Sequence, residues 1–213
     1  MIRKTRPKRI ALLSVMTVLM GGAAIAQSGP NAVVDAVASP VITQPPLALT
    51  AVQSLSFGTV NIPNGTETGH KCAYETRIVS TVLYELDENG SAVTASTPNA
   101  SGCDWGNTGT PDIQNGLVSV VCNSASVVDF AGEWITGAAT GIELKRPNSA
   151  GLRAYQSGTE TAIANGAMNG TLRATCPVSG EMDIAVGGRI EMTDEVVASA
   201  NISVGTITLD ATY

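Results

Sequence analysis

Histidine and aromatic residues are scarce in this sequence, and their scarcity argues against an enzyme. One histidine, His70, is present among 213 residues, and Phe, Trp and Tyr together make up 4% of the chain. A Ser-His-Asp triad would have to use His70, but no G-x-S-x-G motif is present to expose a serine nucleophile. The acidic pairs Asp87-Glu88 and Asp194-Glu195 lie beside turn signals, where carboxylates are usually solvated. We therefore predict that the protein has no catalytic residues and is not an enzyme.

Motifs for metals and cofactors are also missing. The sequence has no C-x-x-C pair and no D-x-D-x-D run, which are typical of zinc and calcium sites respectively. His70 and Cys72 are close in sequence, but they supply too few ligands for a tetrahedral site without distant help. We predict no cofactor and no metal.

Basic residues are concentrated at the N-terminus, where five of the 12 in the chain lie within the first nine positions. An uncharged apolar run, 10–26, follows and ends on Ala-Ile-Ala, which is the layout of a secretory signal peptide with its cleavage site. A membrane anchor is the alternative, but the run is shorter than the ~20 residues that a span needs. We predict a signal peptide over 1–26, a mature chain without a membrane span, and secretion through the periplasm to the cell surface or beyond.

The mature chain would be strongly acidic. Loss of five of the 12 basic residues leaves seven, against 18 acidic residues. Such a chain repels the phosphate backbone of nucleic acids and anionic membrane surfaces. We predict that nucleic acid is not a partner.

All four cysteines, Cys72, Cys103, Cys122 and Cys176, lie in the predicted mature chain. An even number in an exported chain is typical of disulfides, here two. Three pairings are possible. We favour Cys72–Cys103 with Cys122–Cys176, because this pairing forms two loops that do not overlap.

Short runs of alternating apolar and polar residues follow one another through the predicted domain, 47–213. The runs are 47–53, 55–60, 74–86, 117–122, 126–136, 140–144, 171–176, 182–192 and 202–213. Asn-Gly pairs at 64–65, 89–90, 115–116, 165–166 and 169–170 predict type I′ hairpin turns between strands. The pattern favours an all-β fold, an antiparallel immunoglobulin-like β-sandwich of about nine strands.

The segment between the signal peptide and this domain, 27–46, reads as an extended lead. Prolines at 30, 40, 45 and 46 forbid a continuous helix. The small apolar residues of the lead share one parity and would line one face of an extended chain: Ala32, Val34, Ala36 and Ala38.

The last strand alternates up to the final residue. One parity holds the apolar side chains Ile207, Leu209, Ala211 and Tyr213, and the other holds three threonines and Asp210. We expect a half-buried strand with these four side chains on its core face. Ile202 and Val204 have the opposite parity, so a bulge is expected near Gly205.

One loop offers a candidate ligand site. Trp105 lies between Asp104 and Asn107, and an exposed tryptophan beside polar side chains could stack on a sugar. The alternative is that Trp105 covers the disulfide of Cys103, and we favour this alternative.

Two stretches resemble a known family. Leu55-Ser56-Phe57-Gly58-Thr59-Val60 is similar to the Phe-Gly-Thr-Val element near the start of fimbria-like major subunits of the Mat/Ecp group and of the related spore coat protein U-like secreted pilins. The end of the chain, 182–213, is similar to the final strands of that group, although Asn201-Ile202-Ser203 replaces the expected Gly-x-Tyr. The two stretches cover about a quarter of the mature chain, and residues 66–180 could not be aligned.

The resemblance implies a secreted structural subunit of a Gram-negative bacterial surface fimbria. In such subunits the sandwich lacks a strand, which a chaperone first supplies and a neighbouring subunit then replaces. The expected partners are like subunits, a periplasmic chaperone and an outer-membrane usher. Residues 31–42 would be the donor strand, and the terminal strand would form a wall of the groove. The alternative is a self-contained extracellular module that binds a glycan or a protein.

Overall fold

The structure is a computed structural model that describes residues 47–63, 71–86, 91–95, 102–105, 113–199 and 201–213. The chain divides after Thr43 into two compact units, and every described residue belongs to the second, Gln44–Tyr213. Within the described ranges all regular secondary structure is β-strand. Several predicted features lie outside these ranges: the signal peptide 1–26, the lead 27–46 with Ala32, Val34, Ala36 and Ala38, and the single residues His70 and Asn107.

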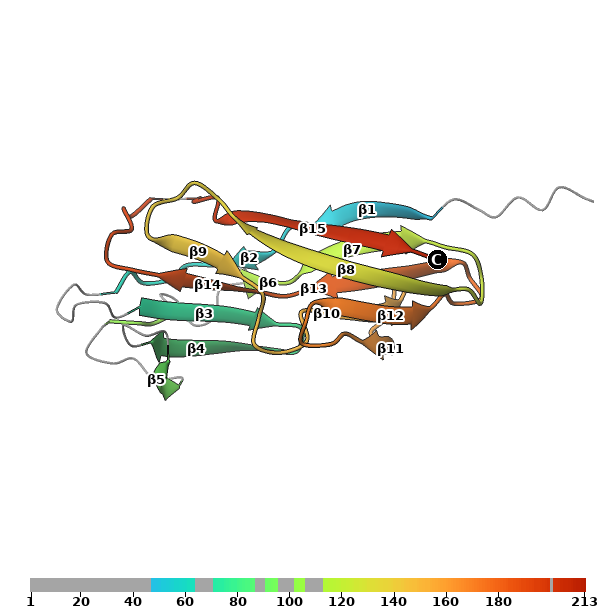
Figure 1. The fold of residues 1–213 in the computed structure, drawn as a ribbon, viewed down its shortest axis with the longest axis horizontal. Coiled ribbons are helices and arrows are strands. Elements are labelled where there is room, and N and C mark those ends of the chain that lie inside the picture. Colours follow the sequence, from blue (N-terminus) through green and yellow to red (C-terminus); the bar gives the residue numbers. More distant parts are fainter. Residues whose placement is uncertain (1–46, 64–70, 87–90, 96–101, 106–112, 200) are drawn as a thin grey trace, which may run out of the picture. The chain divides into compact units, whose positions relative to one another are not determined.

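The strands form three sheets and a short ladder, all of them antiparallel (Figure 1). The first sheet has the order β1 (Ala48–Gln53), β7 (Gly116–Val121), β13 (Glu181–Val186), β10 (Leu152–Gln156) and β11 (Ala162–Asn165). The second sheet has the order β12 (Thr171–Thr175), β8 (Val127–Thr136) and β15 (Gly205–Thr212). The third sheet has the order β5 (Ala92–Ala95), β4 (Ser80–Leu86), β3 (Lys71–Arg77), β14 (Gly188–Met192) and β9 (Ile142–Lys145), and β2 (Ser56–Phe57) pairs with β6 (Ile113–Gln114). The prediction of an antiparallel all-β fold is confirmed, with more strands than the nine expected.

β13 and β14 follow one another with only Gly187 between them, yet they belong to different sheets. β13 pairs with β7 and β10, whereas β14 pairs with β3 and β9. This stretch of chain therefore carries the first sheet into the third, and Figure 1 shows the two strands end to end.

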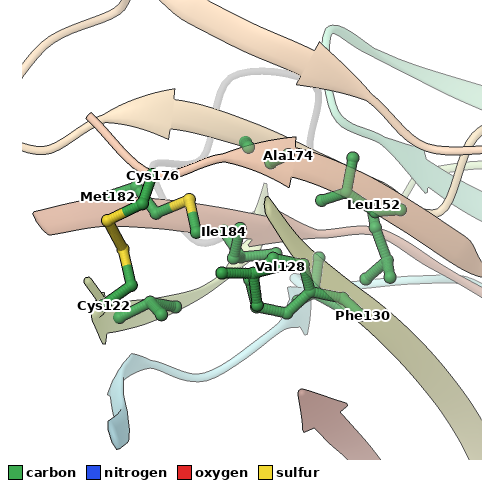
Figure 2. Close-up of a cluster of buried hydrophobic side chains, with 12 residues drawn as sticks. Cys122, Val128, Phe130, Leu152, Ala174, Cys176, Met182 and Ile184 are labelled. Atoms are coloured by element: carbon green, nitrogen blue, oxygen red, sulfur yellow. A yellow bond between two sulfur atoms is a disulfide. The ribbon is translucent and has the colours of Figure 1, made fainter. Parts of the chain in front are cut away.

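The first hydrophobic cluster lies between the first and second sheets. Its buried members come from both sheets, and Cys122 and Cys176 close it at one end with a disulfide (Figure 2). They are Val120, Cys122, Val128, Phe130, Leu152, Ala154, Leu172, Ala174, Cys176, Met182, Ile184 and Val186. Alternate residues of each strand supply these side chains, as expected for sheets that cover each other's apolar faces.

The second hydrophobic cluster covers one face of the third sheet. Its buried members are Phe57, Cys72, Tyr74, Leu83, Cys103, Ile142, Leu144, Ile190, Met192 and Val196. The chain that packs against this face includes the two-residue strand β2, the segments 60–62 and 202–204, which form no strands, and the side chains of Trp134 on β8 and Ile207 on β15. The third sheet is therefore covered mainly by irregular chain, with two side chains from the second sheet.

Trp134 on β8 packs against both clusters. Its ring lies in a slot made by Gly132, Gly151 and Gly170, where an added Cβ would come within 2.8–2.9 Å of the indole. The indole Nε1 donates a hydrogen bond of 2.9 Å to the carbonyl of Gly187, which lies between β13 and β14. Only glycine leaves room for the ring at these three positions.

The run 74–86, expected as one strand, is a hairpin. β3 and β4 pair with Arg77 opposite Ser80, so Ile78 and Val79 form the turn. A two-residue turn reverses the parity, and Tyr74 therefore shares its face with Leu83, its cross-strand partner. The predicted alternation across 74–86 is wrong, because a turn interrupts it. The sequence did not indicate this turn, since neither Ile78 nor Val79 is a Gly, Asn or Pro.

The described Asn-Gly pairs do not form the expected type I′ turns. That turn needs positive φ at both central residues, but among these pairs only Gly170 has it, at +84°. Gly170 closes a turn by donating its N–H to the carbonyl of Ala167 at 3.2 Å. Asn115-Gly116 instead joins β6 to β7, two strands that do not pair with each other.

Candidate functional site

A groove of about 920 Å³ lies over the second cluster. Segments 55–62 and 196–204 flank it, and side chains of β9 and β14 contribute to its lining. The apolar lining residues are Leu55, Phe57, Val60, Ile62, Ile142, Ile190, Met192, Val196, Ala198, Ile202 and Val204. The volume of the groove lies within the usual range for ligand sites in proteins, and its exposed lining is divided about evenly between polar and apolar atoms.

The depth of the groove is limited by large side chains. Phe57, Ile190 and Met192 are each no more than 7% exposed and fill the space over the third sheet. The residues higher on the two flanking segments are only half-buried, including Ile62 and Ile202. The floor of the groove is therefore more buried than its two sides.

The main chain of the first flanking segment is paired on one side. The N–H of Asn61 donates to the carbonyl of Asp104 at 3.0 Å, and the carbonyl of Asn61 accepts from the Tyr74 hydroxyl at 2.6 Å. Main-chain groups of neighbouring residues in an extended chain point to opposite sides. Those of Val60 and Ile62 therefore face the other way, and within the described part of the chain no partner is found for them.

The second flanking segment is held in a similar way. The carbonyl of Val204 accepts a hydrogen bond of 2.9 Å from the N–H of Gly137, at the end of β8. The main-chain groups of Ser203, the preceding residue, have no partner among the described residues. Both flanking segments thus offer unpaired main-chain groups beside an apolar floor.

The terminal strand lies beyond the groove. Ile207, Leu209 and Ala211 are half-buried and pack against the first cluster, which places them on the core face as expected. The expected core position of Tyr213 is wrong: the side chain is 47% exposed, and its hydroxyl accepts a hydrogen bond of 2.8 Å from the N–H of Asn123. Tyr213 lies past the end of β15, so the strand no longer directs its side chain inward.

The groove wall that we expected from β15 is formed by the residues before it. No residue of 205–213 lines the groove, whereas Ile202 and Val204 do. No bulge occurs within β15, since its pairing with β8 is continuous from Gly205 to Thr212. The strand begins at Gly205, where an added Cβ would lie 2.2 Å from the carbonyl oxygen of Ile135.

Two of the three residues proposed as a ligand loop, Asp104 and Trp105, are half-buried. Trp105 is half-buried and packs edge-to-face on Tyr74, with ring centroids 5.0 Å apart. Asp104 binds Tyr74 and Asn61 through its main chain. Asn107 lies outside the described residues. The Trp105 ring therefore packs in the neighbourhood of the disulfide rather than standing out as a stacking surface.

The cysteines form the two pairs that we favoured, Cys72–Cys103 and Cys122–Cys176. All four side chains are at most 2% exposed. The first bond attaches residues 102–105 to β3 beside the groove, and the second joins the ends of β7 and β12. Each of the two hydrophobic clusters thus contains one disulfide.

Charged side chains gather on the face of the third sheet opposite the second cluster. Glu75 is fully buried and accepts hydrogen bonds from Arg77 Nε at 2.7 Å and from the N–H of Asn148 at 3.1 Å. Lys145 Nζ lies 2.6 Å from Glu191 Oε2 and 2.8 Å from Glu143 Oε2. These pairs attach the chain after β9 to the sheet and tie neighbouring strands together.

Two of these groups titrate abnormally. Partial burial acts to lower the pKa of Lys145, but its hydrogen bonds to Glu143 and Glu191 outweigh that effect and raise it. The hydrogen bond from Lys145 lowers the pKa of Glu143. Both shifts favour the charged forms, as in a structural ion pair.

A second hollow, of about 500 Å³, lies over the outer face of the second sheet. Asp129 and Arg173 contribute to its lining and form a two-pronged salt bridge, with N–O distances of 2.6 and 2.8 Å. This hydrogen bond lowers the pKa of Asp129. The two charges satisfy each other on adjacent strands, and Thr171, Asp210 and Thr212 are the other polar residues that line this hollow.

Across the described residues, no three His, Cys, Asp or Glu side chains come together in a way that could hold a metal ion. The same ranges contain no helix with the length and apolar character to cross a membrane.

The sequence predicted a groove only through the family resemblance, and it did not identify the lining of the groove described above. The Phe-Gly-Thr-Val element at 57–60 does contribute a wall, and the parity change at Ile202 and Val204 marks the other. Tyr74, which binds the first wall from behind, carried no signal in the sequence. Comparisons with protein-family models, with curated proteins and with solved structures each found no match.

Proposed function

We propose that this chain is a secreted, non-enzymatic structural subunit of a fimbria-like bacterial surface assembly, joined to its neighbours by β-strand addition. In this assembly, residues 31–42 of one copy occupy the groove of the next. The fold that belongs to this function is an immunoglobulin-like sandwich with one position left for a donated strand. A periplasmic chaperone and an outer-membrane usher would handle the subunit before it meets its neighbours.

The observation that carries this proposal is the groove itself. Strand addition needs an apolar floor for alternate side chains and unpaired main-chain groups beside it. The groove has such a floor, and the main-chain groups of Val60, Ile62 and Ser203 have no partner among the described residues. An extended segment laid between the two walls would satisfy both requirements.

The size of the proposed donor side chains agrees with the shape of the groove. The alternating face of the lead carries alanines at 32, 36 and 38 and valine at 34. Because Phe57, Ile190 and Met192 already fill the floor, small side chains can enter without displacing them. A donor with larger residues would need a deeper groove.

We propose that the donated lead comes from a neighbouring copy. The lead joins β1 at Ala48, which lies opposite Val121, and Val121 also lies opposite Glu181. The groove floor at Ile190 is reached by following β13 and β14 for nine residues, roughly 30 Å at ~3.3 Å per residue. A head-to-tail contact between copies propagates into a filament.

The experiment is to express the whole chain with its own N-terminus in a Gram-negative host. Mass spectrometry of the exported product determines whether cleavage follows Ala26. Size-exclusion chromatography reports assembly, and fluorescence anisotropy reports binding of a labelled peptide of residues 31–42. We expect cleavage, concentration-dependent oligomers and saturable binding of the peptide.

A matched peptide with Val34→Asp is the control, since it keeps the length and the main chain but places a charge on the apolar face. We expect it to bind at least tenfold more weakly. A monomer that neither oligomerises nor distinguishes the two peptides would overturn the proposal.

A further inference from the structure

We propose that the Cys72–Cys103 disulfide and the Tyr74 hydroxyl act together to position residues 58–62 of the first flanking segment, here called the 58–62 wall. They hold this wall ready to accept a strand. This role rests on the proposed function, because it concerns how the same groove is maintained. None of the three residues lines the groove, so they act on it through other residues.

The first part of the device is the covalent link. Cys72 lies on β3, a central strand of the third sheet, and its bond to Cys103 fixes the next residue, Asp104, beside that strand. The carbonyl of Asp104 then accepts the N–H of Asn61 at 3.0 Å. The disulfide therefore sets the position of an acceptor that the wall needs.

The second part is the Tyr74 hydroxyl, which is buried and lies between the wall and the attached segment. It lies 2.6 Å from the carbonyl oxygen of Asn61 and 3.0 Å from that of Asp104, and it accepts the N–H of Asp104 at 3.2 Å. A hydroxyl has one proton to donate, and the shorter distance favours Asn61 as its acceptor. Edge-to-face packing of Trp105 on the ring helps to fix the direction of this hydroxyl.

The hydroxyl keeps its proton over the whole physiological range. Burial raises the pKa of Tyr74 to about 12, despite the opposing effect of its main-chain hydrogen bonds. The donor to the Asn61 carbonyl is thus always present in the folded protein.

The consequence for the groove follows from the alternation of the chain. Both main-chain groups of Asn61 are bound on the side away from the groove. Since neighbouring residues direct their main-chain groups to the opposite side, fixing Asn61 aims those of Val60 and Ile62 at an incoming strand. Binding of a donated strand then costs less conformational entropy, because the wall is already ordered.

The other disulfide supplies a matched control. Cys122–Cys176 is equally buried, but it closes the first cluster and contacts no residue of the 58–62 wall. Its removal should lower stability without changing the wall.

The test compares three variants of the full chain with the wild type: Tyr74→Phe, the pair Cys72→Ala and Cys103→Ala, and the control pair Cys122→Ala and Cys176→Ala. Hydrogen exchange resolved to single amides measures the wall directly at Asn61. We expect at least tenfold faster exchange at Asn61 in the first two variants and unchanged exchange in the control, after correction for global stability.

The second measurement is the affinity for the labelled peptide of residues 31–42. We expect at least a tenfold loss in Tyr74→Phe and in the Cys72/Cys103 variant, and a change under twofold in the control. Tyr74→Phe keeps the ring and its packing on Trp105, so it isolates the hydroxyl. If the Cys72/Cys103 variant does not fold, Tyr74→Phe alone tests the positioning role.

The two readouts separate this role from the proposed function. If the wild type does not bind the peptide, the proposed function fails, and exchange at Asn61 still decides whether Tyr74 positions the wall. If the wild type binds but Tyr74→Phe has wild-type exchange and affinity, the positioning role is overturned while the proposed function stands.

Discussion

The half of the described structure built around the first cluster and the half built around the second cluster bury their apolar side chains in different ways. The first cluster is enclosed by strands of two sheets, whereas the second is covered on one face mainly by segments that form almost no strand, together with Trp134 of β8 and Ile207 of β15. Each half has one buried disulfide. In the first half the disulfide closes a finished core, and in the second it holds a segment beside a groove. The comparison teaches that a core can be well buried even where irregular chain covers most of one face of its sheet.

The largest expected effect on the unfolding free energy comes from making a cavity in the first cluster. Ile184→Ala removes a fully buried side chain from the first cluster and leaves a cavity. Such truncations cost about 2–5 kcal/mol of unfolding free energy, which chemical denaturation can measure. A cost below about 1 kcal/mol would mean that the first cluster is not tightly packed around Ile184.

A smaller effect is expected at high pH, through Tyr74. The unfolded chain releases this proton near the ordinary pKa of 10.0, whereas the folded protein holds it until about 12. The pKa is raised on folding, so the contribution is fully present below pH 10 and is lost as the pH rises toward 12. At ~1.4 kcal/mol per unit, the loss is roughly 2–3 kcal/mol.

Denaturation at several alkaline pH values measures this loss, and Tyr74→Phe is its control. The variant should lack the part of the pH dependence that Tyr74 causes, while the remaining tyrosines still titrate. An identical slope between pH 10 and 12 in both proteins would contradict the assignment.

Truncation in the groove should cost less than truncation in the enclosed core. Ile62 is only half-buried, so Ile62→Ala loses part of the transfer free energy and leaves no closed cavity. We expect about 1 kcal/mol, together with weaker binding of the 31–42 peptide. Equal costs for Ile62→Ala and Ile184→Ala would remove the distinction between the two halves.

The smallest effect concerns the ion pairs of the third sheet. Glu143 has a lowered pKa because of Lys145, so its contribution is present above the unfolded value of 4.5 and is lost as the pH falls below it. Its side chain is about half exposed, and solvent screening keeps the contribution below about 0.5 kcal/mol. Glu143→Gln should flatten the acid limb of the stability curve by that amount, and a larger change would indicate a more buried role.

The sequence indicated the features that depend on local pattern. The alternation of Ile207, Leu209 and Ala211 predicted a half-buried last strand, and the preference for loops that do not overlap favoured the disulfide pairs that the structure has. The hairpin at Ile78-Val79 was missed because neither residue is a turn former. β10 and β11 were missed because their five- and four-residue lengths gave too few alternations to count.

The groove could be expected but not located from the sequence. Its walls come from residues about 140 apart in the chain, and its floor from two strands of a sheet whose order no local pattern specifies. The contact of Tyr74 with Asn61 and Asp104 spans 13 and 30 residues. Such contacts depend on the whole topology rather than on any motif.

Trp134 has a consequence for how the protein unfolds. Its ring packs into both clusters, and its Nε1 is bonded to the carbonyl of Gly187, where the chain passes from one sheet to the next. Loss of either core would therefore remove packing from the other through Trp134, and also through Ile207, which packs against both clusters. The two halves should lose structure in a single cooperative transition, and Trp134→Ala should separate it into two, with the groove half melting first.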